Sequence, residues 1–204
     1  MEYINIFIKS ILVDNMIFAY FLGMCSYLAI SKTVKTSWKL GLAVLLVMIL
    51  TVPLNFLIGE YLLKKGAMTW ISSSLAEIDL SFLSFIMFIA VVAAVVQMLE
   101  MLIEKISPSL HNSLGIFLPL IAVNCAILGA SLIMQEKGYT NVAQAAVYGF
   151  GSGIGWLFAI VSIAAIREKI RYSNVPKGLR GIGIAFIISG LMAISLLAFV
   201  GLEI

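Results

Sequence analysis

Long uncharged stretches alternate along this chain with short segments that hold most of its charged residues. A helix needs about 20 apolar residues to cross a hydrocarbon core roughly 30 Å thick. Each uncharged stretch approaches or exceeds that length, so the pattern predicts an all-α integral membrane protein. We predict six membrane-spanning helices, at approximately residues 4–30, 40–58, 80–99, 113–135, 142–166 and 181–202.

The first and fourth spans are each expected to be interrupted near a cysteine. In the first span, Asp14 lies within the apolar stretch and Gly23 closely precedes Cys25. In the fourth span, Pro119 precedes Cys125. Proline removes a helical hydrogen bond, and glycine lowers helix stability. These two spans are therefore predicted to be broken helices.

The composition argues against a water-soluble domain. Hydrophobic residues make up 62% of the 204 residues and charged residues only 11%, whereas a soluble domain carries roughly 25% charged residues. The net charge of +3 comes from basic residues that flank the spans, which argues against a nucleic-acid partner. No basic n-region or small-residue cleavage site is visible at the start, so we expect no removed signal peptide. We expect one membrane domain over residues 1–204, embedded in a lipid bilayer.

The connections between spans predict the orientation of the chain. The segments after the first, third and fifth spans hold nine lysines and arginines, whereas the other face holds four. Cytoplasmic loops carry the excess of basic residues, so both termini are predicted to lie outside the cytoplasm. The predicted connections are a basic loop at 31–39, the longest polar segment at 60–79, a loop at 105–112, a turn at 135–141 and a basic loop at 167–180.

The pattern Cys-x-x-Leu-x-x-Ser occurs at residues 25–31 and again at 125–131, and it contains both cysteines of the chain. The two copies lie three spans apart. Because three is odd, equivalent elements would cross the membrane in opposite directions. This arrangement is a 3+3 inverted repeat, with halves of approximately 1–104 and 105–204, and it brings interrupted helices together near the bilayer midplane.

Two interpretations of Cys25 and Cys125 stay open from the residues alone. A membrane cysteine is usually a small, inert packing residue. Alternatively, the two thiols bind metal, but two are too few for a tetrahedral site. A [2Fe–2S] cluster is commonly held by four cysteines, so this interpretation requires a second chain that supplies two more.

Other candidates are weaker. His111 is the sole histidine, which excludes a histidine-based metal site within this chain. Asp14, Gln97 and Glu100 lie in or beside spans, where polar groups can mark ion paths. Four glycines could suggest a nucleotide-binding loop, but they do not fit G-x-G-x-x-G, and their four-residue spacing favours close helix packing. They are Gly149, Gly151, Gly153 and Gly155.

Several long stretches resemble the E subunits of the bacterial sodium-translocating NADH:quinone reductases. They are 14–25 (DNMIFAYFLGMC), 114–129 (LGIFLPLIAVNCAILG), 148–156 (YGFGSGIGW) and 171–176 (RYSNVP). The resemblance covers nearly the whole chain. It implies a six-span protein of the inner membrane that pairs with a homologous D subunit of opposite orientation, within a complex that also contains A, B, C and F subunits. It also implies that Cys25 and Cys125 are two of the four ligands of an intramembrane [2Fe–2S] centre.

The function implied by the resemblance is electron relay within the complex, without catalysis by this chain alone. Electrons from NADH would pass from a cytoplasmic flavin and iron–sulfur subunit, through the shared centre, towards flavin on the far side and finally to quinone, while sodium is exported. A related possibility is the equivalent subunit of the ferredoxin:NAD oxidoreductase complex. Other classes that fit are a small inverted-repeat secondary transporter and a structural membrane subunit, both with inert cysteines.

Overall fold

The computed structural model describes residues 2–63, 83–106, 121–122 and 124–198, and this part of the chain contains helices but no strand. The α-helices are α1 (Glu2–Leu12), α2 (Met24–Ile30), α3 (Val34–Ile58), α4 (Ser84–Ile106), α7 (Cys125–Lys137), α8 (Val142–Ile170) and α9 (Ile182–Leu197). A short π-helix, η1 (Gly59–Leu63), continues α3, and a 3-10 turn, η5 (Lys177–Leu179), precedes α9.

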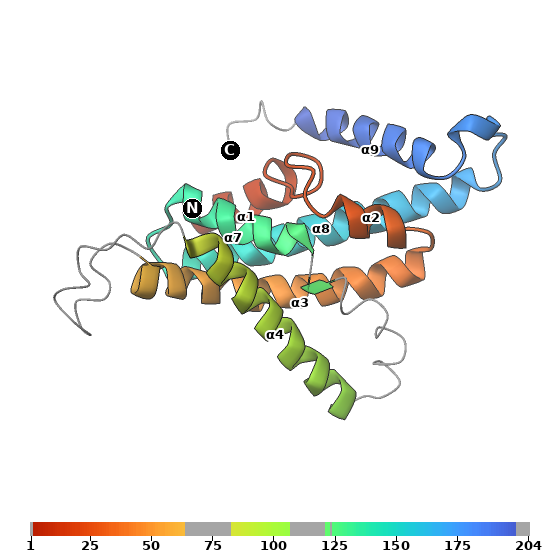
Figure 1. Cartoon of the computed structure of the whole chain (residues 1–204). Helices are drawn as coiled ribbons and strands as arrows, with labels where there is room; N and C mark the ends of the chain where they lie inside the picture. The colour runs from red at the N-terminus through yellow and green to blue at the C-terminus, as the bar shows by residue number, and fades with distance from the viewer. Residues whose placement is uncertain (1, 64–82, 107–120, 123, 199–204) are drawn as a thin grey trace.

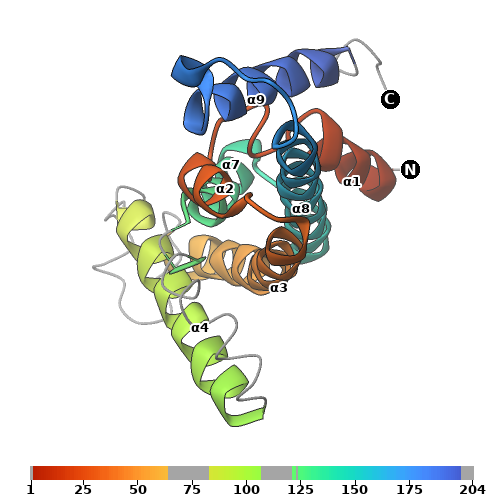
Figure 2. The ribbon, with the colours of Figure 1, turned by 90° about the vertical axis from the view of Figure 1, so that its right-hand side faces the viewer.

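Helices α3 and α8 form the antiparallel centre of the molecule. They lie side by side over most of their length, with α1, α2 and α7 packed on them (Figure 1). Helix α4 lies on one side of this group and α9 on the opposite side (Figure 2).

The glycines of α8 allow this close packing. A Cβ atom at Gly149 would lie 2.9 Å from the Cβ atom of Val52 and 3.0 Å from the carbonyl oxygen of Met48, both on α3. Gly153 faces Leu45 of the same helix. Small residues at four-residue spacing let helix backbones approach closely. The predicted packing role of Gly149 and Gly153 is therefore confirmed.

The other two glycines of α8 face α1 instead. Gly151 packs against the backbone of Phe7, and a Cβ atom at Gly155 would lie 3.0 Å from the carbonyl oxygen of Ile11. Helix α8 therefore has two glycine faces, one for each neighbouring helix. This confirms the predicted pairing of Gly151 with Gly155.

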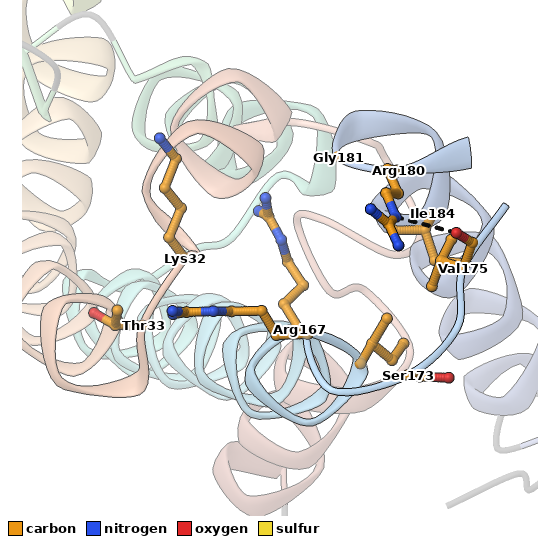
Figure 3. A pocket seen from close by; sticks show the side chains of 10 residues that line it. Lys32, Thr33, Arg167, Ser173, Val175, Arg180, Gly181 and Ile184 are labelled. Atoms are coloured by element: carbon orange, nitrogen blue, oxygen red, sulfur yellow. Dashed lines mark hydrogen bonds between the residues drawn. The ribbon is translucent and has the colours of Figure 1, made fainter. Parts of the chain in front are cut away.

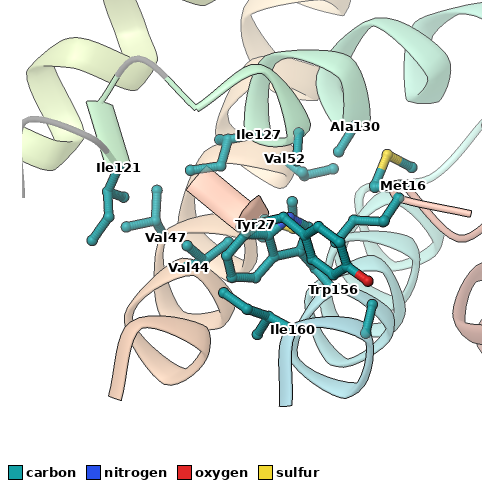
Figure 4. Packing of buried hydrophobic residues seen from close by; sticks show 14 of the residues in the cluster. Met16, Tyr27, Val44, Val47, Val52, Ile121, Ile127, Ala130, Trp156 and Ile160 are labelled. Atoms are coloured by element: carbon teal, nitrogen blue, oxygen red, sulfur yellow. The ribbon is translucent and has the colours of Figure 1, made fainter. Parts of the chain in front are cut away.

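The core lies where α2, α3, α7 and α8 meet. Tyr27, Tyr148 and Trp156 are its largest fully buried side chains. Tyr27 and Trp156 lie together among aliphatic residues that include Val44, Ile127 and Ile160 (Figure 4). The core therefore joins α2 and α7, the two helices that begin at the cysteine stretches.

Side chains stabilise the starts of several helices. Thr33 precedes α3, and its hydroxyl oxygen accepts from the N–H of Thr36 at 3.4 Å. Asn124 precedes α7, and Asn141 precedes α8 with Gln144 in a capping box. Such residues satisfy backbone N–H groups that have no partner within the helix. The predicted start of the fifth span at residue 142 coincides with the start of α8.

Several predicted boundaries are wrong, because helices extend beyond the uncharged stretches. The loop predicted at 31–39 becomes helix from Val34, and the helix predicted to end near 99 continues to Ile106. Helix α8 continues to Ile170, into the predicted basic loop at 167–180. Basic side chains in a last helical turn interact favourably with its free carbonyl groups. A charge therefore ends the apolar stretch but not the helix.

Three described helices are long and apolar enough to cross a membrane, namely Val34–Leu63 with its π-helical end, Ser84–Leu102 and Val142–Ile170. The apolar helix at Ile182–Leu196 is shorter. Helices α4 and α9 expose large apolar side chains, as surfaces that face lipid do. They include Phe85, Ile86, Met98, Met101, Ile182, Phe186, Leu191 and Ile194. The six-span count and the interrupted fourth span stay predictions, since residues 107–120 lie outside the described part.

We expect Gly149→Ala to destabilise the protein by about 1–3 kcal/mol, because the added methyl group meets Val52 and the α3 backbone. Thermal unfolding of the purified protein in detergent would measure the change. The control is Gly190→Ala in α9, where a Cβ atom has nothing within 4 Å. Equal unfolding temperatures for the two variants would contradict the close packing of α3 and α8.

Candidate site at the two cysteine stretches

Cys125 is the first residue of α7. Asn124 precedes it in an extended conformation and caps the helix, with its Oδ1 accepting from the N–H of Ala126 at 3.1 Å. The start of α7 at Cys125 therefore has a local cause, because asparagine at the N-cap position replaces a missing intrahelical partner. Residues 121–122 are helical, whereas Pro119, which was predicted to interrupt this span, lies outside the described residues.

Cys25 lies at the second position of α2, after a non-helical segment that follows α1. Gly23 immediately precedes α2 with a left-handed φ of 83°. Glycine adopts this conformation at no steric cost, whereas other residues rarely do. Gly23 thus allows the chain to turn into α2 directly before the cysteine.

Asn15 stabilises the break between α1 and α2. Its Nδ2 donates to the carbonyl oxygen of Ile11 at 2.9 Å and to that of Gly155 at 3.0 Å. Its Oδ1 accepts from the N–H of Ile17 at 3.0 Å. The side chain is fully buried, so it satisfies backbone groups that water cannot reach.

The structure brings the two cysteine stretches together. The N–H of Gly23 donates to Sγ of Cys125 at 2.9 Å. A Cβ atom at Gly23 would lie 2.7 Å from Nε1 of Trp156 and 2.9 Å from the Cβ atom of Ala126. Because only glycine fits this space, the start of α2 can rest directly on the start of α7.

Neither cysteine is fully buried. Cys25 is exposed and Cys125 is partly exposed, and neither forms a disulfide. Within the described residues, no three or more His, Cys, Asp or Glu side chains are placed to hold a metal ion. The two thiols alone therefore do not form a complete metal site.

Two buried N–H donors near this contact have no hydrogen-bond partner within the described structure. They are Nδ2 of Asn124 and Nε1 of Trp156, and both side chains border Gly23. Leaving a buried polar group unpaired costs about 1–3 kcal/mol. Together with the N–H of Gly23, which donates to Sγ of Cys125, they place three N–H donors around the contact between the two cysteine stretches.

The serines of the two Cys-x-x-Leu-x-x-Ser copies have matching environments. Ser31 accepts from Nη1 of Arg167 at 2.7 Å, and Ser131 accepts from Nδ2 of Asn55 at 2.7 Å. Arg167 lies on α8 and Asn55 on α3. Each serine therefore accepts a hydrogen bond from the long helix of the opposite half of the chain. Sequence reasoning missed these two partners and also Asn15. A polar residue inside or at the end of an apolar stretch is the signal that could have identified them.

The other candidates lie away from this contact. Asp14 forms an ion pair with Lys137 beside a cleft of about 480 Å³. Burial, with Asp14 close by, raises the pKa of Tyr139 in the same cleft to about 12, so its phenol stays neutral at ordinary pH. Gln97 and Glu100 lie on α4. His111 lies outside the described residues.

Comparison with known proteins gives the family. The family model described as "Rnf-Nqr subunit, membrane protein" matches residues 3–203. A protein of Methylococcus capsulatus, named as the E subunit of Na(+)-translocating NADH-quinone reductase, is 54% identical over 201 residues, or 98% of each chain. The protein of that name from Maridesulfovibrio salexigens is 54% identical over 200 residues, again 98% of each chain.

A third relative has the same name and comes from Rhodopirellula baltica. It is 51% identical over 210 residues, which is 99% of this chain and 98% of the relative. These matches extend along nearly the whole chain and include both cysteine stretches. They confirm the resemblance found in the sequence, and the chain belongs to the Rnf-Nqr family of membrane proteins.

Proposed function

We propose that this chain is the E subunit of a sodium-translocating NADH:quinone reductase and relays electrons within the membrane. The names of the relatives support the complex. The observation that carries the relay function is the hydrogen bond from Gly23 to Cys125, which joins the starts of α2 and α7. Cys25 lies two residues after Gly23, so the two cysteines lie close together in the fold.

The thiols fit a [2Fe–2S] centre that is shared with a second chain. Such a centre is commonly held by four cysteines, and the described part of this chain offers two accessible ones without a third ligand. We assign the other two to the homologous D subunit, which would present the same pair from the opposite orientation. The centre supplies one-electron transfer when it is bound.

The residues around the thiols fit that centre as well. Hydrogen bonds to cluster sulfurs help to set its reduction potential. The N–H of Gly23 already donates to Sγ of Cys125 at 2.9 Å, and the donors of Asn124 and Trp156 have no partner in the described structure. In this proposal the three groups compensate the negative charge of thiolate ligands in a region of low dielectric constant.

The membrane arrangement that we propose has six spans in a 3+3 inverted repeat, with α1–α2 and α7 as the interrupted elements. The antiparallel α3 and α8 support it, as does the matched bonding of Ser31 and Ser131 from the opposite halves. The excess of basic residues supports both termini outside the cytoplasm. Interrupted helices of opposite direction would place the thiols within reach of both membrane faces.

The equivalent subunit of the ferredoxin:NAD oxidoreductase complex is the second candidate, because the matching family model includes both complexes. The relatives above are named for the quinone reductase, which favours the first candidate. In either complex this chain would hold the same centre.

We expect Cys25→Ser and Cys125→Ser each to abolish the centre. In the purified complex, iron bound to the pair of homologous subunits and its EPR signal should both be lost, because a cluster held by four cysteines loses one ligand. Quinone reduction should stop, whereas NADH oxidation by an artificial acceptor at the NADH-oxidising subunit should continue. Met24→Leu is the neighbouring control and should retain iron. Unchanged iron in both cysteine variants would remove the assignment, and unchanged sodium transport in them would favour a transporter.

We also expect Trp156→Phe to lower the reduction potential of the centre by tens of millivolts, because it removes an N–H donor while keeping an aromatic ring. Redox titration followed by EPR would measure the potential, and iron content should stay unchanged. Trp38→Phe is the matched control, since Trp38 lies exposed near the start of α3. An identical potential in wild type and both variants would show that Trp156 has only a packing role.

A further inference from the structure

We propose that the cleft between the turn after α2, the end of α8 and the start of α9 binds the headgroup of an anionic phospholipid. The cleft has a volume of about 650 Å³ and lies away from the cysteine contact. Four basic side chains line it, and no acidic residue is among its lining residues (Figure 3). The basic residues are Lys32, Arg167, Arg171 and Arg180.

The arginines are held in place and still have donors for a ligand. Nη1 of Arg167 donates to the carbonyl oxygen of Leu28 at 2.9 Å and to Ser31. Nε of Arg180 donates to the carbonyl oxygen of Val175 at 3.1 Å. A guanidinium group has five N–H donors, so each of these two arginines uses one nitrogen for position and keeps others. Guanidinium groups match phosphate oxygens in geometry and charge.

The nearest acidic side chain on α8 is engaged elsewhere. Glu168 follows Arg167 directly, but its Oε1 accepts from the N–H of Val34 at the start of α3 at 3.4 Å. It therefore helps to fix the start of α3 and does not line the cleft. The positive charges of the cleft have no carboxylate partner among its lining residues, and an anion would balance them.

The surroundings favour a lipid over a soluble phosphate. Ile170 and Ile184 supply apolar lining beside the basic groups. Helix α9 continues from the cleft and exposes Ile182 and Phe186, at 63% and 52% of their surface. An anionic phospholipid matches this arrangement, because its headgroup would contact the basic cleft and its acyl chains the apolar face of α9. Basic pockets between helices on the cytoplasmic side of membrane proteins bind such lipids, and this end of the chain is the predicted cytoplasmic one.

The test uses the delipidated whole complex in a neutral detergent and measures binding of phosphatidylglycerol and of phosphatidylcholine by native mass spectrometry and by equilibrium binding. We expect phosphatidylglycerol to bind and phosphatidylcholine not to bind. The double variant Arg171→Ala/Arg180→Ala should weaken phosphatidylglycerol binding about 10- to 30-fold, because each basic group near an anionic headgroup contributes roughly 1 kcal/mol.

The matched control is Lys35→Ala/Lys39→Ala. It removes the same charge from exposed residues of α3 at the same end of the molecule, outside the cleft. Binding that falls equally in both double variants would overturn the proposal, since it would reflect net charge alone. No phosphatidylglycerol binding by the wild-type complex would overturn it too. Displacement of phosphatidylglycerol by inorganic phosphate at the same concentration would overturn the lipid assignment, because the cleft would then bind a soluble phosphate. Iron content should stay unchanged in both double variants. A loss of lipid binding without a loss of iron distinguishes this proposal from the one on the cysteines.

Discussion

Backbone that leaves the helical conformation inside an apolar protein has to find hydrogen-bond partners within that protein, because lipid supplies none. Within the described residues, the backbone leaves the helical conformation beside each cysteine, before α2, which begins at Met24, and at Asn124, directly before α7. Asn15 bridges the first break to α8, and Asn124 caps the second. Each asparagine compensates a break that alone would cost several kcal/mol in hydrocarbon. The position of both sulfurs depends on these two amides.

The same constraint explains the glycines of α8. For Asn15 to reach the carbonyl oxygen of Gly155, α1 must approach the α8 backbone closely, and the absence of a side chain at Gly155 permits this. Gly149 and Gly153 permit an equally close approach of α3 on another face. Helix α8 is thus the element against which the first half of the chain is positioned. Gly23 then completes the contact, because its N–H can reach Cys125 only when no Cβ atom separates α2 from Trp156.

The hydrophobic pattern was sufficient to predict an all-helical membrane protein, whereas the role of the two cysteine stretches stays a prediction. The pattern also predicted the packing role of the α8 glycines, because small residues at four-residue spacing have one common physical use in apolar helices. It misplaced the ends of helices, as at 31–39, since Thr33 caps a helix whose first turns carry lysines. Contacts between distant residues, such as Ser131 with Asn55, could not be predicted. They depend on the three-dimensional approach of α3 and α7, which periodicity within either segment does not determine.

The two halves of the chain use different residues at the start of the helix that carries the cysteine. Gly23 provides a left-handed turn before one cysteine, whereas Asn124 provides a side-chain cap before the other. The serines at the ends of the two patterns are likewise bonded by an arginine in one half and an asparagine in the other. An inert packing cysteine needs neither a helix start nor a neighbouring donor. Both cysteines lie in the first turn of a helix, and Sγ of Cys125 accepts a backbone N–H from the opposite half. These two features support the shared centre that we propose.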